Sequence, residues 1–298
     1  MKVGKAAGPD NIPVSAIKEF TPIIEPILIK IANSSLRLGH YPKCFKEATC
    51  IVIPKPNKKS YREASSYRPI SLLNHLSKLI ETVMTKRLQY ELDTRKLIPS
   101  THFGCRKGSG TDDALLYVTE FIQNAWKQKK VVTALALDAQ GAFNNVIHEK
   151  LLEECRKVGL PKYLTRWIGC FLKDRKIRFK FSNYTSSTFA LSKGSPQGSP
   201  ISGPLYLIYN TALLKASREV IKVGYADDVL WMSAASTPKE ARSLLESQIH
   251  EADDWSTTHG TPLDIAKTQY STALGREGNC TNSSHEVSWL DVGQQAII

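Results

Sequence analysis

The stretch Tyr225-Ala226-Asp227-Asp228 constrains the fold more than any other part of this chain. Apolar runs flank it on both sides, at residues 220–224 and 229–232. Such runs favour strands and Ala-Asp-Asp favours a turn, so the pattern predicts a β-hairpin with the acids at its tip. Clustered carboxylates repel one another unless a cation compensates them, and Mg²⁺ prefers oxygen ligands. A solvated Asp-Asp turn is the alternative for an isolated pair.

A third carboxylate ends another apolar run. Residues 131–137 are almost entirely apolar and Asp138 follows them, which predicts a buried strand with Asp138 at its exit. One acid at a strand end and two on a neighbouring hairpin can hold two metal ions, which clamp the attacking and leaving oxygens of a phosphoryl transfer. Between these motifs, residues 193–200 form a Gly/Pro-rich loop. It either caps the apolar segment that follows or brings Gln197 to a substrate.

The order of these motifs resembles reverse transcriptases, most of all those of non-LTR (LINE-type) retrotransposons. Asp138 and Phe143, then residues 194–200, then residues 225–228 follow the family's order. Further segments are similar to its opening motif, its fingers motifs and its lysine-bearing motif: residues 4–13, 51–58, 67–72, 103–108 and 266–268. The resemblance covers nearly the whole chain. It implies an α+β right-hand polymerase with fingers and palm, a mixed or antiparallel palm sheet backed by helices, and no thumb.

This resemblance implies a division of the chain. We expect residues 1–130 to be mostly fingers, helical with strands near residues 50–70, and residues 131–275 to be the palm with the catalytic site. Residues 276–298 are expected to be a polar tail or the start of the primer-grip region. Periodicity predicts the other elements. Helices are expected at 70–92, 112–128, 148–158, 161–172, 201–215 and 238–257, and strands at 50–53, 175–182, 187–192 and 268–274, with the helices on one face of the sheet.

The resemblance also implies roles for single residues. Asp138, Asp227 and Asp228 would hold two Mg²⁺ ions, for which Mn²⁺ could substitute, and Lys267 would protonate the pyrophosphate. The incoming dNTP would meet Lys55, Arg68, Phe143 and Gln197, and Tyr225 would pack against the primer end. Phe143 would exclude a 2′-hydroxyl by its bulk, and the alternative is an aromatic ring packed in the core. For Lys267 the alternative is an ordinary surface lysine.

Charge points to a polyanionic partner. The net charge is +12, and basic residues cluster at 55–68 and 173–180. In the second cluster they alternate with Ile177, Phe179 and Phe181, so we expect Arg175 and Arg178 to line a nucleic-acid groove. A solvated edge strand is the alternative. An RNA template and a DNA primer are the expected partners, and the sequence does not give the oligomeric state.

Cysteine spacing and the absence of targeting signals indicate the cellular compartment in which we expect the protein. The six cysteines are scattered without zinc-site spacing, which favours free thiols in a reducing compartment. Neither a signal peptide nor a membrane-spanning run is expected. We therefore expect an intracellular protein of the nucleus or cytoplasm, or of the mitochondrion if the element is of the intron type.

Three functions are consistent with the motifs. The first is an RNA-directed DNA polymerase that adds dNTPs to a primer 3′-hydroxyl. The second is the polymerase part of a group II intron maturase. The third is a truncated, inactive remnant that still binds nucleic acid. Without thumb, endonuclease or further domains, we expect a truncated domain that binds primer–template weakly.

Overall fold

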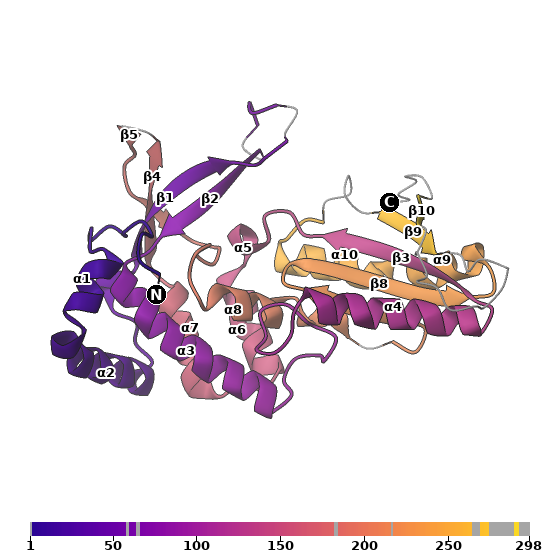
Figure 1. Ribbon diagram of the computed structural model, residues 1–298, viewed down its shortest axis with the longest axis horizontal. Coiled ribbons are helices and arrows are strands. Elements are labelled where there is room, and N and C mark those ends of the chain that lie inside the picture. The colour runs from indigo at the N-terminus through magenta and orange to yellow at the C-terminus, as the bar shows by residue number, and fades with distance from the viewer. Residues whose placement is uncertain are drawn as a thin grey trace. The chain divides into compact units, whose positions relative to one another are not determined.

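The computed structural model describes residues 2–57, 60–63, 66–181, 184–215, 217–263, 269–273 and 289–291, the last stretch and residue 269 as backbone only. The chain divides into two compact units (Figure 1). Unit 1 comprises Met1–Leu97 and Phe143–Tyr209, and unit 2 comprises Ile98–Ala142 and Asn210–Ile298. Each unit combines a β-sheet with helices, which agrees with the predicted α+β class.

The sheet of unit 1 has the strand order β2-β1-β4-β5, and β6 also pairs with β4. These strands are β1 (Glu47–Pro54), β2 (Tyr67–Leu72), β4 (Arg175–Phe181), β5 (Tyr184–Thr185) and β6 (Phe189–Leu191). β1 pairs with β2 in antiparallel and with β4 in parallel orientation. The parallel pair joins the second segment of unit 1 to the first, across a long stretch of intervening sequence.

Helices complete unit 1. They are α1 (Val14–Glu19), α2 (Thr21–Leu38), α3 (His75–Thr94), α6 (His148–Lys157), α7 (Lys162–Leu172) and α8 (Ser202–Tyr209), with the 3₁₀ turn η1 (Lys43–Phe45). The short α5 (Ala142–Asn145) spans the boundary between the units. Trp167 and Phe171 of α7 stack with ring centroids 5.4 Å apart, and the Trp167 indole N–H donates to the Ser35 hydroxyl of α2 at 2.8 Å. This hydrogen bond fixes the aromatic face of α7 against α2.

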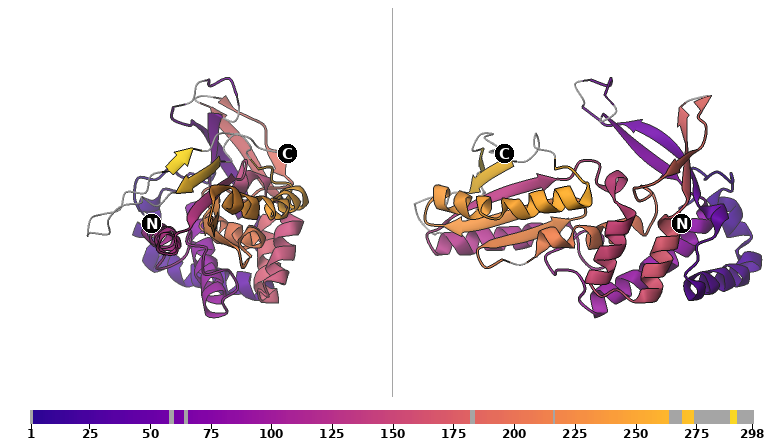
Figure 2. Two further views of the ribbon diagram at one scale, coloured as in Figure 1. Left: turned by 90° about the vertical axis from the view of Figure 1, so that its right-hand side faces the viewer. Right: turned by 180° about the vertical axis from the view of Figure 1, so that it is seen from behind.

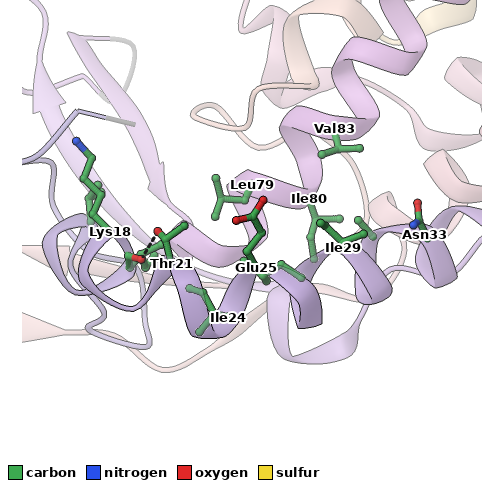
Figure 3. A pocket seen from close by; sticks show the side chains of 13 residues that line it. Lys18, Thr21, Ile24, Glu25, Ile29, Asn33, Leu79, Ile80 and Val83 are labelled. Atoms are coloured by element: carbon green, nitrogen blue, oxygen red, sulfur yellow. Dashed lines mark hydrogen bonds between the residues drawn. The ribbon is translucent and has the colours of Figure 1, made fainter.

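Unit 1 also carries an apolar pocket between α1, α2 and α3. Ile24 and Ile29 of α2 line it together with Leu79 and Val83 of α3 (Figure 3). About half of the surface of Ile29 and of Val83 is exposed. The pocket contains none of the residues to which the sequence assigns chemistry.

The sheet of unit 2 has the order β10-β9-β3-β8-β7, and every neighbouring pair is antiparallel. Its strands are β3 (Val131–Asp138), β7 (Val220–Tyr225), β8 (Asp228–Ala235), β9 (Gln269–Ala273) and β10 (Trp289–Asp291). The predicted strand with Asp138 at its end and the predicted hairpin are both confirmed. The hairpin is β7–β8, and its two-residue turn is Ala226-Asp227.

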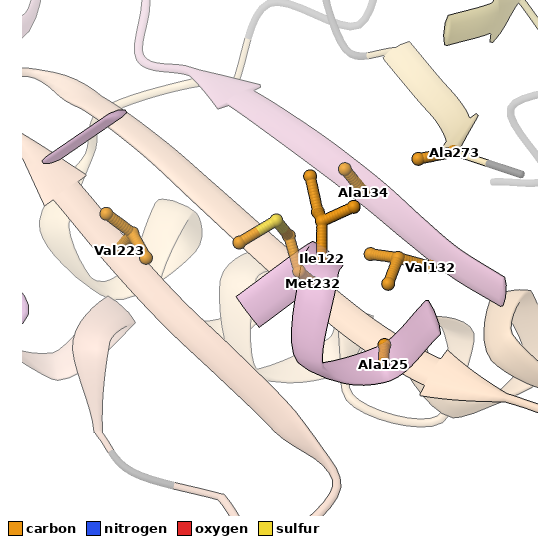
Figure 4. Close-up of a cluster of buried hydrophobic side chains, with 7 residues drawn as sticks. All are labelled: Ile122, Ala125, Val132, Ala134, Val223, Met232 and Ala273. Carbon is orange, nitrogen blue, oxygen red and sulfur yellow. The ribbon is translucent and has the colours of Figure 1, made fainter. Parts of the chain in front are cut away.

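Helices cover both faces of this sheet, so the predicted one-sided arrangement is wrong. On one face, Ile122 and Ala125 of α4 (Thr111–Lys127) pack with Val132, Ala134 and Met232 (Figure 4). On the other, Ser233 of β8 donates to the Ala241 carbonyl of α9 (Pro238–Glu246) at 2.6 Å. Figure 2 shows α9 and α10 (Ile249–His259) along this second face. Cover on both sides explains why β3 is almost uniformly apolar rather than alternating.

Several predicted boundaries differ from the observed ones. The 70–92 segment begins as strand β2, because residues 67–72 pair with β1, and the helix starts only at His75. The 201–215 helix ends at Tyr209 and a 3₁₀ turn follows, η3 (Thr211–Leu214). The 238–257 helix is two helices, α9 and α10, separated at residues 247–248. The predicted helix at 112–128 is confirmed as α4.

The predicted division into fingers and palm stays a prediction. The boundaries of the two compact units differ from the boundary predicted between residues 130 and 131. Residues 143–209, expected in the palm, share unit 1 with residues 1–97, because β4 pairs with β1. The predicted tail, residues 276–298, lies outside the described residues except for β10, which pairs with β9. Within the described ranges, no helix combines the length and apolar character needed to cross a bilayer.

Candidate functional site

Asp138 and Asp228 are direct neighbours across two strands of unit 2. Asp138 is the last residue of β3, Asp228 is the first of β8, and the antiparallel register places them opposite each other. Residues opposite each other in such a pair point to the same face, with Cβ atoms roughly 4.5–5.5 Å apart. Asp138 is half-buried and Asp228 is exposed. Ala136, on the same face, is also exposed, so this face is open beside the two carboxylates.

Asp227 occupies the hairpin turn next to this pair. Ala226, before it, has a φ of 55°, in the left-handed region that residues other than glycine rarely adopt. Tyr225 ends β7 opposite Asp228, so its side chain shares the face of Asp138 and Asp228. Asp227 and Tyr225 are both half-buried. The turn therefore has an unfavourable backbone conformation, which the surrounding structure must hold.

Residues 101–104 of unit 2 lie against this turn. Phe103 N–H donates to the Gly224 carbonyl at 2.8 Å, and Gly224 N–H donates to the Thr101 carbonyl at 3.0 Å. A Cβ at Gly104 would lie 2.1 Å from the backbone nitrogen of Ala226, so only glycine fits this close approach. The motif at residues 103–108, expected among the fingers, thus begins as a support for the acidic hairpin.

A buried side-chain pair supports the same turn. The His102 Nε2 atom lies 3.0 Å from the Asn210 Oδ1, and the Asn210 Nδ2 donates to the Ala226 carbonyl at 3.1 Å. Both side chains are almost completely buried. Burial lowers the pKa of His102 to about 4, so the ring is neutral near pH 7. Neither residue was singled out from the sequence, because only the folded chain brings residues 102, 210 and 226 together.

The negative charge of Asp227 acts on Cys105, which follows residues 101–104. Burial raises the pKa of the Cys105 thiol, and the negative charge of Asp227 raises it further. Cys105 is one of five free cysteines in the described part of the chain, where free thiols were predicted.

The donor set fits a hard divalent cation by its chemistry. Asp138 and Asp228 present carboxylate oxygens on one face, and these are the ligands that Mg²⁺ prefers. Across the described residues, no three Asp, Glu, His or Cys side chains are already gathered as a cage for a metal ion. Strand register thus sets two carboxylates on one face, and Asp227 lies in the turn beside them.

In unit 1, the loop that carries Gln197 is fixed at three points. Ser71 N–H donates to the Gln197 carbonyl at 2.9 Å, which ties the loop to β2. A Cβ at Gly198 would lie 2.6 Å from the Ser71 carbonyl oxygen, and Gly198 has a φ of 126°. The Ser199 hydroxyl donates to the Glu81 carboxylate of α3. The half-buried Gln197 side chain therefore projects from a constrained backbone.

Glu81 is the buried centre of this anchor. Its side chain is fully buried, and its second carboxylate oxygen accepts from the Tyr41 hydroxyl. Burial raises the pKa of Tyr41, and the charge of Glu81 raises it further. The helical pattern places Glu81 on α3, but no signal in the sequence marks it as the partner of the Gln197 loop.

Phe143 also belongs to unit 1. Its ring is half-buried and lies 5.1 Å, centroid to centroid, from the ring of Tyr206 in α8. Its carbonyl accepts from the Ser195 N–H at 2.7 Å. Phe143 is thus held beside the loop of Gln197, and the residue is only partly buried.

The two basic clusters meet on one face of the unit 1 sheet. Arg68 is opposite Ile53 of β1, and Lys180 is opposite Ile51. Because residues two apart share a face, Lys176 and Arg178 lie on the face of Lys180 and Arg68. The Arg178 guanidinium also lies 3.6 Å from the Glu47 carboxylate on that face. We refer to Arg68, Lys176, Arg178 and Lys180 as the basic face.

Arg175 is not part of this face, so its predicted role in a groove is wrong. Its side chain is 2% exposed and donates to the Phe171 carbonyl at 3.1 Å. The guanidinium carbon lies 4.8 Å from the centroid of the Phe171 ring. The alternation along β4 places Arg175 with Ile177 on the other face, where packing against α7 covers it.

Lys55 and Lys267 are the remaining predicted site residues. Lys55 follows β1 directly, its side chain is half-buried, and its N–H donates to the Ser66 carbonyl at 2.8 Å. Lys267 lies outside the described residues.

Known proteins share the sequence features of this chain. Residues 53–293 match the profile of the family described as reverse transcriptase (RNA-dependent DNA polymerase). The chain is 30% identical over 287 residues to the RNA-directed DNA polymerase from mobile element jockey of Drosophila melanogaster, covering 94% of this chain and 31% of that protein. It is 30% identical over 258 residues to the probable RNA-directed DNA polymerase from transposon BS of the same species, covering 84% and 28%. The chain thus spans about a third of the length of these relatives.

Among solved structures, apo telomerase from Candida tropicalis truncated from its C-terminal domain is similar in fold. The TM-score is 0.55 at 13% sequence identity, covering 83% of this chain and 53% of that chain. A structure of telomerase from the same organism with a fragment of telomeric RNA has a TM-score of 0.56 at 12% identity, covering 76% of this chain and 41% of that one.

Proposed function

Since this chain belongs to the reverse transcriptases, the RNA-dependent DNA polymerases, we propose that it adds deoxynucleotides to a primer 3′-hydroxyl on an RNA template. The related mobile-element polymerases favour a non-LTR retrotransposon as its source. One observation carries the proposal: the register of β3 and β8 sets Asp138 opposite Asp228, beside the turn of Asp227.

These three acids would hold the divalent ions. Two such ions, when bound, lower the pKa of the primer 3′-hydroxyl and stabilise the pyrophosphate leaving group. Asp138 and Asp228 would supply oxygen ligands from strand ends, and Asp227 would supply them from the turn. Tyr225, on the face of Asp228, would pack against the primer end.

The side chains of unit 1 would bind the incoming nucleotide. The Arg68 guanidinium is a bidentate donor for phosphate oxygens, and the Lys55 ammonium is a flexible point charge. Gln197 would contact the nucleotide from a loop held by Ser71 and Glu81. Lys267 would act as the acid that protonates pyrophosphate.

Primer extension with the purified chain tests the proposal. The assay supplies an RNA template, a DNA primer, dNTPs and Mg²⁺ or Mn²⁺, with a parallel reaction in excess chelator. Extension that needs the metal supports the polymerase. Binding of primer–template without extension under any of these conditions would support a nucleic-acid-binding remnant instead.

Nucleic-acid binding should depend steeply on salt, with the basic face supplying part of the slope. Replacing Arg178 and Lys180 by Gln should reduce the slope of log affinity against log salt by about 0.7–0.9 for each phosphate that the variant no longer neutralises. Fluorescence anisotropy with an RNA–DNA hybrid at several salt concentrations measures this. A control with equal charge loss replaces Lys127 and Lys129, both exposed in unit 2. Equal slopes for both double variants would show that the basic face does not bind phosphates.

Replacing Phe143 by Ala should relax discrimination against ribonucleotides. A smaller side chain removes a clash with the 2′-hydroxyl without removing a metal ligand. We expect the ratio of dNTP to rNTP incorporation efficiency to fall about tenfold, a gain set by one steric contact. Single-nucleotide primer extension measures both efficiencies, and Phe189→Ala, an exposed ring of β6, is the control. If both efficiencies fall together, Phe143 serves only to pack against Tyr206.

A further inference from the structure

The turn of Asp227 is held in place from one side by residues outside the hairpin. Backbone bonds join Phe103 and Thr101 to Gly224, and Gly104 lies against Ala226. These interactions fix the end of β7 before the turn, but they do not reach the carbonyl of Ala226. That carbonyl accepts from the Asn210 side chain at 3.1 Å.

Asn210 is itself oriented by His102. A neutral ring that donates through Nε2 to the Asn210 Oδ1 determines which end of the amide is the acceptor, so that Nδ2 faces Ala226. A Cβ at Gly224 would lie 3.1 Å from His102 Nδ1, so the ring fits into space that glycine leaves.

Burial shields the two hydrogen bonds of Asn210 from competition by water. Asn210 is 1% exposed and His102 is 0% exposed, so water cannot replace either bond. Ala226 has a left-handed backbone, and losing the bond to its carbonyl would free the peptide that precedes Asp227. Residues that orient metal ligands from outside the ligand set can change metal affinity about 10–100-fold.

We propose that His102 and Asn210 are positioning residues, which hold the Ala226 peptide so that Asp227 and Asp228 are preset for a divalent cation. The part that concerns the cation rests on the function proposed above. The part that concerns the turn does not depend on it.

The first experiment measures how stably the turn is held when no metal is present. Hydrogen exchange by NMR of the Phe103 and Gly224 amides reports whether residues 101–104 stay joined to the hairpin. Asn210→Leu, which has similar size but no polar group, should speed both exchange rates about tenfold, the effect of one buried hydrogen bond. His102→Leu should act in the same direction, whereas His102→Gln, which keeps an N–H donor, should remain near the unchanged protein.

The second experiment measures Mn²⁺ affinity by electron paramagnetic resonance. Asn210→Leu should weaken binding about tenfold or more, with recovery in His102→Gln relative to His102→Leu. Ser233→Ala is the matched control, because it removes a buried hydrogen bond of unit 2 on the opposite face of the sheet. It should lower thermal stability and leave both the exchange rates and the Mn²⁺ affinity unchanged.

The outcomes separate the two proposals. Unchanged exchange at Phe103 and Gly224 in Asn210→Leu would overturn the positioning role, whatever the metal data show. Faster exchange with no Mn²⁺ binding in the unchanged protein would support the positioning of the turn and contradict the metal site. Variants that lose stability as Ser233→Ala does, with the same exchange rates and affinity, would make the pair an ordinary part of the core.

Discussion

Replacing Asp228 by Asn should reduce primer extension at least about 100-fold, the scale seen when one group that stabilises a transition state is removed. Asn keeps the size of the side chain but loses the charge that a divalent cation needs. Asp138→Asn should have a comparable effect, since its carboxylate shares the face of Asp228. Single-turnover extension with saturating primer–template measures the rate.

Although these variants should lose activity, they should not lose thermal stability. Two like charges directly opposite each other destabilise a strand pair, so Asp228→Asn should leave the melting temperature unchanged or raise it in metal-free buffer. Asp253→Asn, an exposed acid of α10, is the control and should keep full activity. An Asp228→Asn variant that extends primers within severalfold of the unchanged chain would contradict the catalytic site.

Gly104→Ala should be among the most damaging substitutions of a single small residue in unit 2. The added Cβ would lie 2.1 Å from the backbone nitrogen of Ala226 and 2.9 Å from the Tyr225 carbonyl carbon. A backbone cannot rotate away as a side chain can, so we expect a loss of about 3 kcal/mol, the upper end for overpacking. Urea unfolding measures the loss, and primer extension should fall with it because the clash displaces the acidic turn.

Gly110→Ala provides the comparison. Gly110 precedes α4 with a φ of −139°, and the nearest atom to an added Cβ is the Asp113 carboxylate at 3.8 Å. Because alanine is a poorer N-cap than glycine, this variant should lower the free energy of unfolding by no more than about 1 kcal/mol. If Gly104→Ala were equally mild, residues 101–104 would not pack against the turn as described.

The sequence by itself determined the elements that carry the acids. A near-continuous apolar run ending in Asp138 predicts a buried strand, and two apolar runs around Ala226-Asp227 predict a hairpin. These patterns are local, because alternation and turn preference depend on neighbours along the chain. The order of motifs also predicted the family, which the match over residues 53–293 confirms.

Strand register was decided only by the tertiary structure. Antiparallel pairing of β3 with β8 sets Asp138 opposite Asp228, and a shift by one residue would have put the two on opposite faces. In unit 1, parallel pairing of β1 with β4 brings Lys180 to the face of Arg68 and buries Arg175 on the other. Charged and apolar residues that alternate along a strand show that the strand has two different faces. They do not show which face the core will cover.

The supports of the site were beyond sequence reasoning for the same reason. Glu81, His102 and Asn210 are common residue types without a local pattern, and each acts on a segment distant in sequence. Local order can be predicted from propensity and period, whereas these interactions form only when loop closure brings remote segments together. The amino-acid sequence thus determined which residues are expected to carry the chemistry. The tertiary structure determined which residues hold them in place.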